Sequence, residues 1–108
     1  SREMFSFLEW LKKQDLQVCF VTPPPATDKG RWAWIEVERT LREKLDAIGV
    51  PLVSSLDWAE AEGGGLKEEF ASMKEVRGIV DTRHGNAKYG ARMLAQCLDV
   101  LGIPYKET

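Results

Sequence analysis

A short run of almost uninterrupted apolar residues, from Leu16 to Thr22, ends at the three consecutive prolines Pro23-Pro24-Pro25. This pattern is typical of a strand that is buried on both faces, as strands are in parallel sheets covered by helices. Proline lacks the N–H that a ladder hydrogen bond requires, so the strand must end before Pro23. The run therefore predicts a buried parallel strand, and such a sheet needs helices packed on its faces.

Three segments have the periodicity of amphipathic helices. The first covers residues 3–14, the second follows a turn at Asp28-Lys29-Gly30, and the last begins at Ala87. The second helix is expected to bury Trp34, Val37, Leu41, Leu45 and Ile48. The charged residues of this helix that are expected to face solvent are Glu36, Glu38, Arg39, Arg42 and Glu43. The last helix is expected to present an apolar stripe of Ala87, Ala91, Leu94, Leu98 and Leu101, with Met93, Cys97 and Val100 beside it.

Glycines and apolar runs complete the alternation of helix and strand. Gly49 predicts a helix end before a second strand at Val50–Val53, and Gly102 predicts another before a third strand at Ile103–Tyr105. Between them, residues 66–73 carry a short helical pattern. We expect one α/β domain over residues 1–108, or the C-terminal part of one. Because so thin a sheet leaves an apolar edge unpaired, we also expect an upstream segment or a second chain to complete it.

Composition excludes several classes of function. The chain is 44% apolar and 30% charged with a net charge of −2, so it offers no basic field for nucleic acid and no polybasic membrane anchor. It has no apolar run of about 18 residues, and its start lacks signal-peptide features, which favours a cytoplasmic location. Cys19 and Cys97 are expected to be free buried thiols. With a single histidine, we expect no metal or cofactor site.

One spacing points to chemistry: Asp81 and His84 lie in a loop between the apolar Ile79-Val80 and the last helix. An aspartate three residues before a histidine can fix the tautomer of the imidazole, which leaves Nε2 free to act as a base. The alternative is structural, with Asp81 helping to cap the last helix and His84 at the surface.

The order of these features resembles the C-terminal portion of the SGNH (GDSL-type) hydrolase family. The match consists of the apolar strand running into Val21-Thr22-Pro23-Pro24-Pro25, a helix, the strand at Val50–Val53, and the block 81–90 opening the final helix; it covers roughly Val18 to Leu101. The resemblance implies a three-layer, flavodoxin-like parallel sheet. It also implies that Asp81 orients His84, the general base that activates a serine for attack on an ester carbonyl.

The chain departs from that family in its nucleophile. The family's Gly-Asp-Ser block, and the Gly and Asn blocks that form its oxyanion hole, do not occur in these 108 residues. Ser54 and Ser55 follow a strand but lack the glycine-flanked turn that exposes a nucleophile. We therefore expect the serine to lie outside this chain.

The expected ligand is a small-molecule or carbohydrate ester. The candidate substrate-binding residues are Trp32, Pro24 and Asn86, because an aromatic face can stack on a sugar or an acyl chain and the other two flank the expected site. Such proteins act as esterases or acyltransferases. The alternative is a non-catalytic α/β module that binds a glycan or a protein. A receiver-like or nucleotide-binding domain is a weaker option, because the required acidic cluster and glycine loop do not occur in the sequence.

Overall fold

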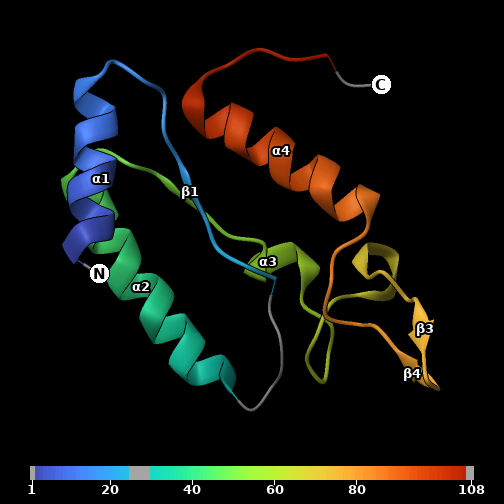
Figure 1. Cartoon of the computed structure of the whole chain (residues 1–108). Coiled ribbons are helices and arrows are strands. Elements are labelled where there is room, and N and C mark those ends of the chain that lie inside the picture. The colour runs from blue at the N-terminus through green and yellow to red at the C-terminus, as the bar shows by residue number, and fades with distance from the viewer. Residues whose placement is uncertain (1, 25–29, 107–108) are drawn as a thin grey trace.

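A computed structural model describes residues 2–24 and 30–106, in which helices pack on one small parallel sheet and a second small sheet lies at the edge of the molecule (Figure 1). The helical elements are α1 (Arg2–Lys13), α2 (Arg31–Ala47), α3 (Leu56–Ala59), the 3-10 helix η2 (Glu68–Phe70) and α4 (Ala87–Leu101). The strands are β1 (Phe20–Val21), β2 (Leu52–Val53), β3 (Glu75–Val76) and β4 (Ile79–Val80). The turn predicted at Asp28-Lys29 lies outside the described residues. None of the described helices is long and apolar enough to cross a membrane.

The predicted parallel strands pair with each other. Phe20 lies beside Leu52 and Val21 beside Val53, in parallel register. The N–H of Phe20 donates to the Pro51 carbonyl at 2.9 Å, and the N–H of Thr22 donates to the Val53 carbonyl at 3.1 Å. The α/β class is confirmed, with β1 and β2 as the one parallel pair among the described residues.

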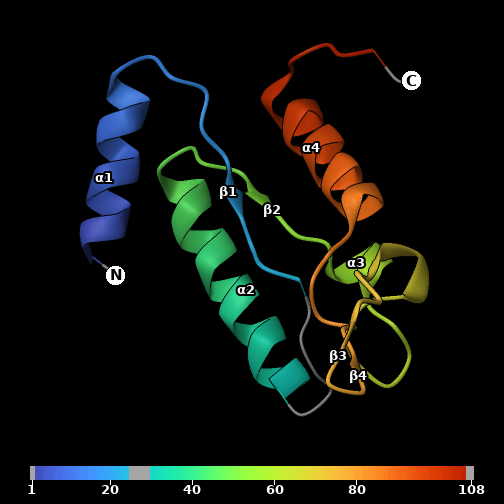
Figure 2. The ribbon, with the colours of Figure 1, turned by 45° about the vertical axis from the view of Figure 1, so that its right-hand side comes forward.

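This strand pair lies between helices on its two faces (Figure 2). Side chains alternate between the faces of a strand, so neighbouring residues enter different clusters. Leu52 packs with residues of α1 and α2, including Leu8 and Leu45. Val53 packs on the opposite side with residues of α3 and α4, including Met93.

The solvent-facing role predicted for Glu38 is wrong. Glu38 is buried in the wall of α2 that faces the strands, whereas Val37, predicted to be buried, is 46% exposed. The Glu38 carboxylate accepts hydrogen bonds from the hydroxyls of Thr22 and Ser54, which follow β1 and β2. These two donors allow a carboxylate to be buried where the helical pattern favours an apolar residue.

The apolar stripe predicted for α4 is also partly wrong. Its buried residues are Tyr89 and Met93, with Cys97 partly buried beside them, while Leu94 is 60% exposed. The Tyr89 hydroxyl is hydrogen-bonded to Ser55 Oγ at 2.8 Å, and its ring lies 5.3 Å from that of Trp58. These contacts turn the Tyr89 side of α4 inward and the Leu94 side outward.

The predicted third strand at Ile103–Tyr105 does not form. Gly102 has a φ of 69°, and the N–H of Ile103 donates back to the Leu98 carbonyl at 2.9 Å. This closes the end of α4 with a glycine cap. The amide of Ile103 is therefore used by the helix, and Pro104 has no N–H to give a sheet.

A hairpin that the sequence interpretation did not anticipate precedes the last helix. β3 and β4 are antiparallel, and they are joined by Arg77 at φ 54° and Gly78 at φ 77°. Positive φ at both central residues is the geometry of the tight turn that suits a two-residue hairpin loop. The sequence signal for this turn is Arg77-Gly78, which stands just before the β-branched pair Ile79-Val80.

Candidate functional site

The hairpin holds the loop that contains Asp81 and His84. The N–H of Asp81 donates to the Lys74 carbonyl at 2.9 Å, and the N–H of Met73 donates to the Asp81 carbonyl at 2.8 Å. Further along, the N–H of Ser72 donates to the His84 carbonyl at 2.8 Å. Both ends of the 81–84 loop are thus fixed to one short segment, residues 72–74, whose middle residue Met73 has a φ of 56°. Figures 1 and 2 place this loop at the end of the molecule where β1 and β2 finish.

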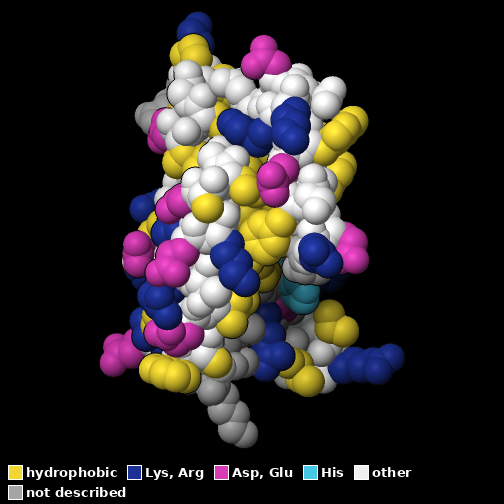
Figure 3. Space-filling view, turned by 90° about the vertical axis from the view of Figure 1, so that its left-hand side faces the viewer, with side chains coloured by type: hydrophobic (Ala, Val, Ile, Leu, Met, Phe, Trp, Pro, Cys, Tyr) yellow, Lys and Arg dark blue, Asp and Glu magenta, His cyan; other side chains and the backbone are white. Residues whose placement is uncertain are grey.

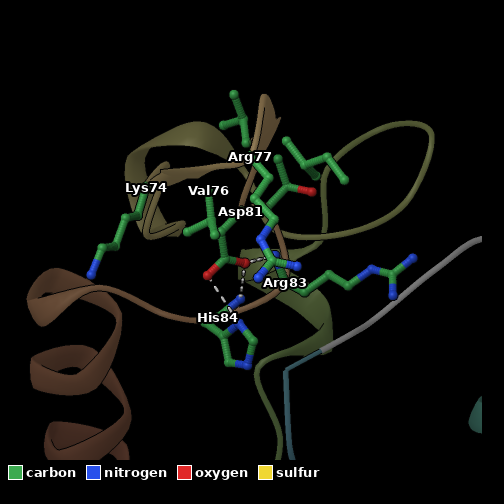
Figure 4. Close-up of a pocket in the computed structure, with 9 residues that line it drawn as sticks. Lys74, Val76, Arg77, Asp81, Arg83 and His84 are labelled. Atoms are coloured by element: carbon green, nitrogen blue, oxygen red, sulfur yellow. Dashed lines mark hydrogen bonds and ion pairs between the residues drawn. The ribbon is translucent and has the colours of Figure 1, made fainter.

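The predicted pairing of Asp81 with His84 is present. Oδ1 of Asp81 accepts hydrogen bonds from the backbone N–H groups of Arg83, at 3.0 Å, and His84, at 3.1 Å. Its other oxygen, Oδ2, lies 2.9 Å from Nδ1 of His84 (Figure 4). Asp81 therefore closes the turn with one oxygen and orients the imidazole with the other. In this arrangement Nε2 lies on the far side of the ring from the carboxylate.

The electrostatics of the pair favour an ionised carboxylate. The backbone N–H of Arg83, followed by the backbone and ring N–H groups of His84, lowers the pKa of Asp81 below its ordinary value. An ionised Asp81 accepts a hydrogen bond from a protonated Nδ1 and so selects the tautomer with an unprotonated Nε2. The imidazole itself is 83% exposed, and Figure 3 shows it at the surface near Lys and Arg side chains.

Asn86, not Asp81, caps α4. Its Oδ1 accepts a hydrogen bond from the N–H of Tyr89 at 2.9 Å. Its Nδ2 donates to the carbonyl of Glu69, at 2.9 Å, and to that of Ala71, at 3.1 Å. The capping role considered for Asp81 is therefore taken by Asn86. The amide of Asn86 is engaged with backbone, so a substrate would have to compete with these bonds.

A pocket of about 680 Å³ opens beside the pair. Besides Asp81 and His84, its lining includes the cations Lys74, Arg77 and Arg83 (Figure 4). The sequence pattern gives no sign of these cations at the site, because Lys74 and Arg77 are brought there by the β3–β4 hairpin. The apolar part of the lining includes Val76 and Ile79.

None of the three predicted substrate-binding residues, Trp32, Pro24 and Asn86, lines this pocket. Trp32, in the first turn of α2, is 77% exposed, and Pro24 follows β1 and is half-buried. Neither lines the pocket beside His84. The structure therefore brings together Asp81 and His84 and leaves Trp32 and Pro24 outside that pocket.

The serines nearest to the strand ends are engaged with other groups. Ser54 Oγ donates to Glu38 Oε1 at 2.6 Å, and Ser55, 1% exposed, is bonded to the Tyr89 hydroxyl. Among the described residues, no serine hydroxyl is hydrogen-bonded to His84. The described part of the chain also holds no group of three or more His, Cys, Asp or Glu side chains arranged to bind a metal ion.

Comparison of the chain with protein-family models, with curated proteins and with solved structures gives no match.

Proposed function

We propose that this chain is the acid–base part of an SGNH-type serine hydrolase or acyltransferase. Its substrate would be a small-molecule or carbohydrate ester, and the nucleophilic serine would lie outside these residues. The observation that carries the proposal is the contact of 2.9 Å between Asp81 Oδ2 and His84 Nδ1 on a largely exposed imidazole. The order of strand, helix, strand and Asp-x-x-His block along the sequence supports it.

The proposed chemistry follows from that contact. A serine hydroxyl placed at Nε2 of His84 gives its proton to the ring as its oxygen attacks the ester carbonyl. Asp81 stabilises the imidazolium that forms. When the ester C–O bond breaks, the ring returns the proton to the leaving oxygen, and the acyl group stays on the serine. Water or an acceptor hydroxyl then takes the acyl group by the same route in reverse.

In this proposal the segment or chain that carries the serine also extends the β1–β2 sheet. Two surface features support that extension. β1 is paired on one edge only among the described strands, and its Val21 is 46% exposed. On the outer side of α4, Leu94 is 60% exposed. An upstream segment or a second chain that added a strand to β1 and a helix beside α4 would cover both features. The result would be a three-layer, flavodoxin-like domain.

The proposal is tested by labelling the complete protein, meaning this chain together with the upstream segment or second chain that carries the serine, with a fluorophosphonate and locating the tag by peptide mass spectrometry. A tag on a serine outside these 108 residues supports the proposal. A tag on Ser54 or Ser55 contradicts the assignment of the nucleophile, and a folded sample without a tag contradicts the activity. In the complete protein His84→Ala should abolish ester turnover, whereas Lys13→Gln, an exposed change on α1, should not.

The alternative is a non-catalytic α/β module that binds a glycan or a protein. The exposure of Trp32, at 77%, favours it, because an open indole face can stack on a sugar ring. This alternative expects glycan binding that is lost in Trp32→Ala and retained in His84→Ala. The enzyme hypothesis expects His84→Ala to abolish turnover instead.

A further inference from the structure

The pocket beside His84 has an excess of positive charge. Lys74, Arg77 and Arg83 all contribute to its lining, and no salt bridge joins any of them to an acidic side chain among the described residues. The one acidic residue in the lining is Asp81, whose carboxylate already accepts two backbone N–H groups and faces the imidazole. Three cations therefore line a pocket whose single anion is engaged.

We propose that this pocket binds an ester that carries a second, negatively charged group, either a carboxylate or a phosphate. The inference rests on the proposed function and names its substrate class. Guanidinium groups hold the two oxygens of such an anion side by side, which gives orientation as well as attraction. Bound in this way, the anion would place the neighbouring ester bond within reach of His84.

The hairpin provides a second element of recognition. Ile79 is 73% exposed and Val76 is 56% exposed, although both are β-branched apolar residues, and both line the same pocket as the cations. Together they provide an apolar wall beside the charged groups. A substrate with a short alkyl chain between its ester and its anion matches this combination of surfaces.

The positions of the cations follow from the backbone. Arg77 occupies the turn of the hairpin at φ 54°, and Lys74 lies just before β3. The carbonyl of Lys74 accepts the N–H of Asp81, so the hairpin and the Asp81–His84 loop share a hydrogen bond. Arg83 lies within the loop itself. The cations are thus fixed to the same short segment as the imidazole.

The test is a binding titration of this chain, followed by NMR at the His84 ring and at backbone amides. Three probes are compared: monomethyl succinate, methyl phosphate and the uncharged dimethyl succinate. At least one anion should shift the signals of His84 and Arg83 at concentrations where the uncharged diester does not. Tighter binding of monomethyl succinate identifies the second group of the substrate as a carboxylate, and tighter binding of methyl phosphate identifies it as a phosphate. Equal binding of the uncharged diester would overturn the inference.

Charge-removing variants make the test specific. Arg77→Gln and Arg83→Gln should each weaken anion binding about 2- to 5-fold, the range for an exposed ion pair. Added salt should weaken it further, since exposed charges are screened. Lys13→Gln, on α1 and outside the pocket, is the matched control. Binding that is unchanged in both arginine variants, with well-dispersed spectra that confirm folding, would contradict the proposal.

This measurement is independent of catalysis, because binding needs no serine. If the fluorophosphonate leaves the sample unlabelled while monomethyl succinate still binds at His84, the proposed enzyme activity fails and the anion site stands. If a serine outside the chain is labelled but the anions bind no better than the diester, the activity stands and the substrate class is wrong.

Discussion

Ser54 donates a hydrogen bond of 2.6 Å from its hydroxyl to Oε1 of Glu38, a residue that is only 7% exposed. The same oxygen accepts the Thr22 hydroxyl at 3.1 Å. Thr22 follows β1 and Ser54 follows β2, so one carboxylate on α2 connects the ends of both strands. The residues that directly follow both strands are therefore tied to α2 through Glu38.

Glu38→Ala should destabilise the fold. It removes the acceptor of the partly buried Ser54 hydroxyl and the nearer of the two acceptors of the buried Thr22 hydroxyl, which costs about 1–3 kcal/mol in the free energy of unfolding. Glu38→Gln keeps an amide oxygen as acceptor and should cost less. Urea denaturation measures both changes. Glu43→Ala is the control, because its exposed pair with Arg39 contributes little; a Glu38→Ala variant as stable as this control would contradict the role of Glu38.

The lowered pKa of Asp81 should make stability depend on pH in the acid range. A carboxyl whose pKa is lower in the folded than in the unfolded chain stabilises the fold above the unfolded value, here about 3.8. That contribution is lost as the pH falls through the lower pKa of the folded chain.

Carbon-detected NMR titration should show the Asp81 carboxyl titrating below 3.8. Asp81→Asn keeps an oxygen for the Arg83 and His84 amides and should remove this part of the acid dependence. Titration of Asp81 at or above 3.8 would contradict the observed hydrogen bonds.

The loop after His84 requires glycine at position 85. A Cβ on Gly85 would overlap the ring of Tyr89, whose hydroxyl is bonded to the buried Ser55. Gly85→Ala should displace the ring and destabilise the fold by about 1–3 kcal/mol.

Gly90 in α4 is the matched control for that change, because a Cβ there meets no atom within 4 Å. Alanine is the better helix former, so Gly90→Ala should stabilise the fold by about 0.5–1 kcal/mol. Thermal unfolding of both variants measures the contrast. A Gly85→Ala variant that unfolds at nearly the same temperature as the unsubstituted protein would show that the Tyr89 ring moves aside without cost.

The parts of the site that the sequence predicts are those fixed by local geometry. Asp81 and His84 are three residues apart, and an aspartate that accepts the amides following it brings its second oxygen to the ring without any distant contact. The positions of β1 and β2 were predictable for a similar reason, since each is a short apolar run beside a proline. Their parallel direction follows from the alternation of helix and strand along the chain.

What the sequence could not predict depends on contacts between distant residues. The burial of Glu38 requires hydroxyls 16 positions away on each side, at Thr22 and Ser54. The inward face of α4 is selected by the bond between Tyr89 and Ser55, 34 positions apart. Periodicity alone cannot choose between Leu94 and Met93 as the buried residue, because both sides of α4 carry apolar residues.

Cys97 should be an unreactive thiol. Both cysteines are free, as predicted, but they are partly rather than fully buried where they pack against the same core cluster. Burial, followed by a hydrogen bond with the Cys19 thiol, raises the pKa of Cys97 to about 11.

At pH 8 this pKa leaves about 200-fold less thiolate on Cys97 than an ordinary thiol of pKa about 8.5 would have. The greater nucleophilicity of a more basic thiolate offsets about 10-fold of that difference. Iodoacetamide should therefore modify Cys97 at least about 10-fold more slowly than it modifies glutathione, as followed by peptide mass spectrometry. Unfolding in urea should remove the difference, and equal rates in the folded protein would show that Cys97 is not buried against Cys19.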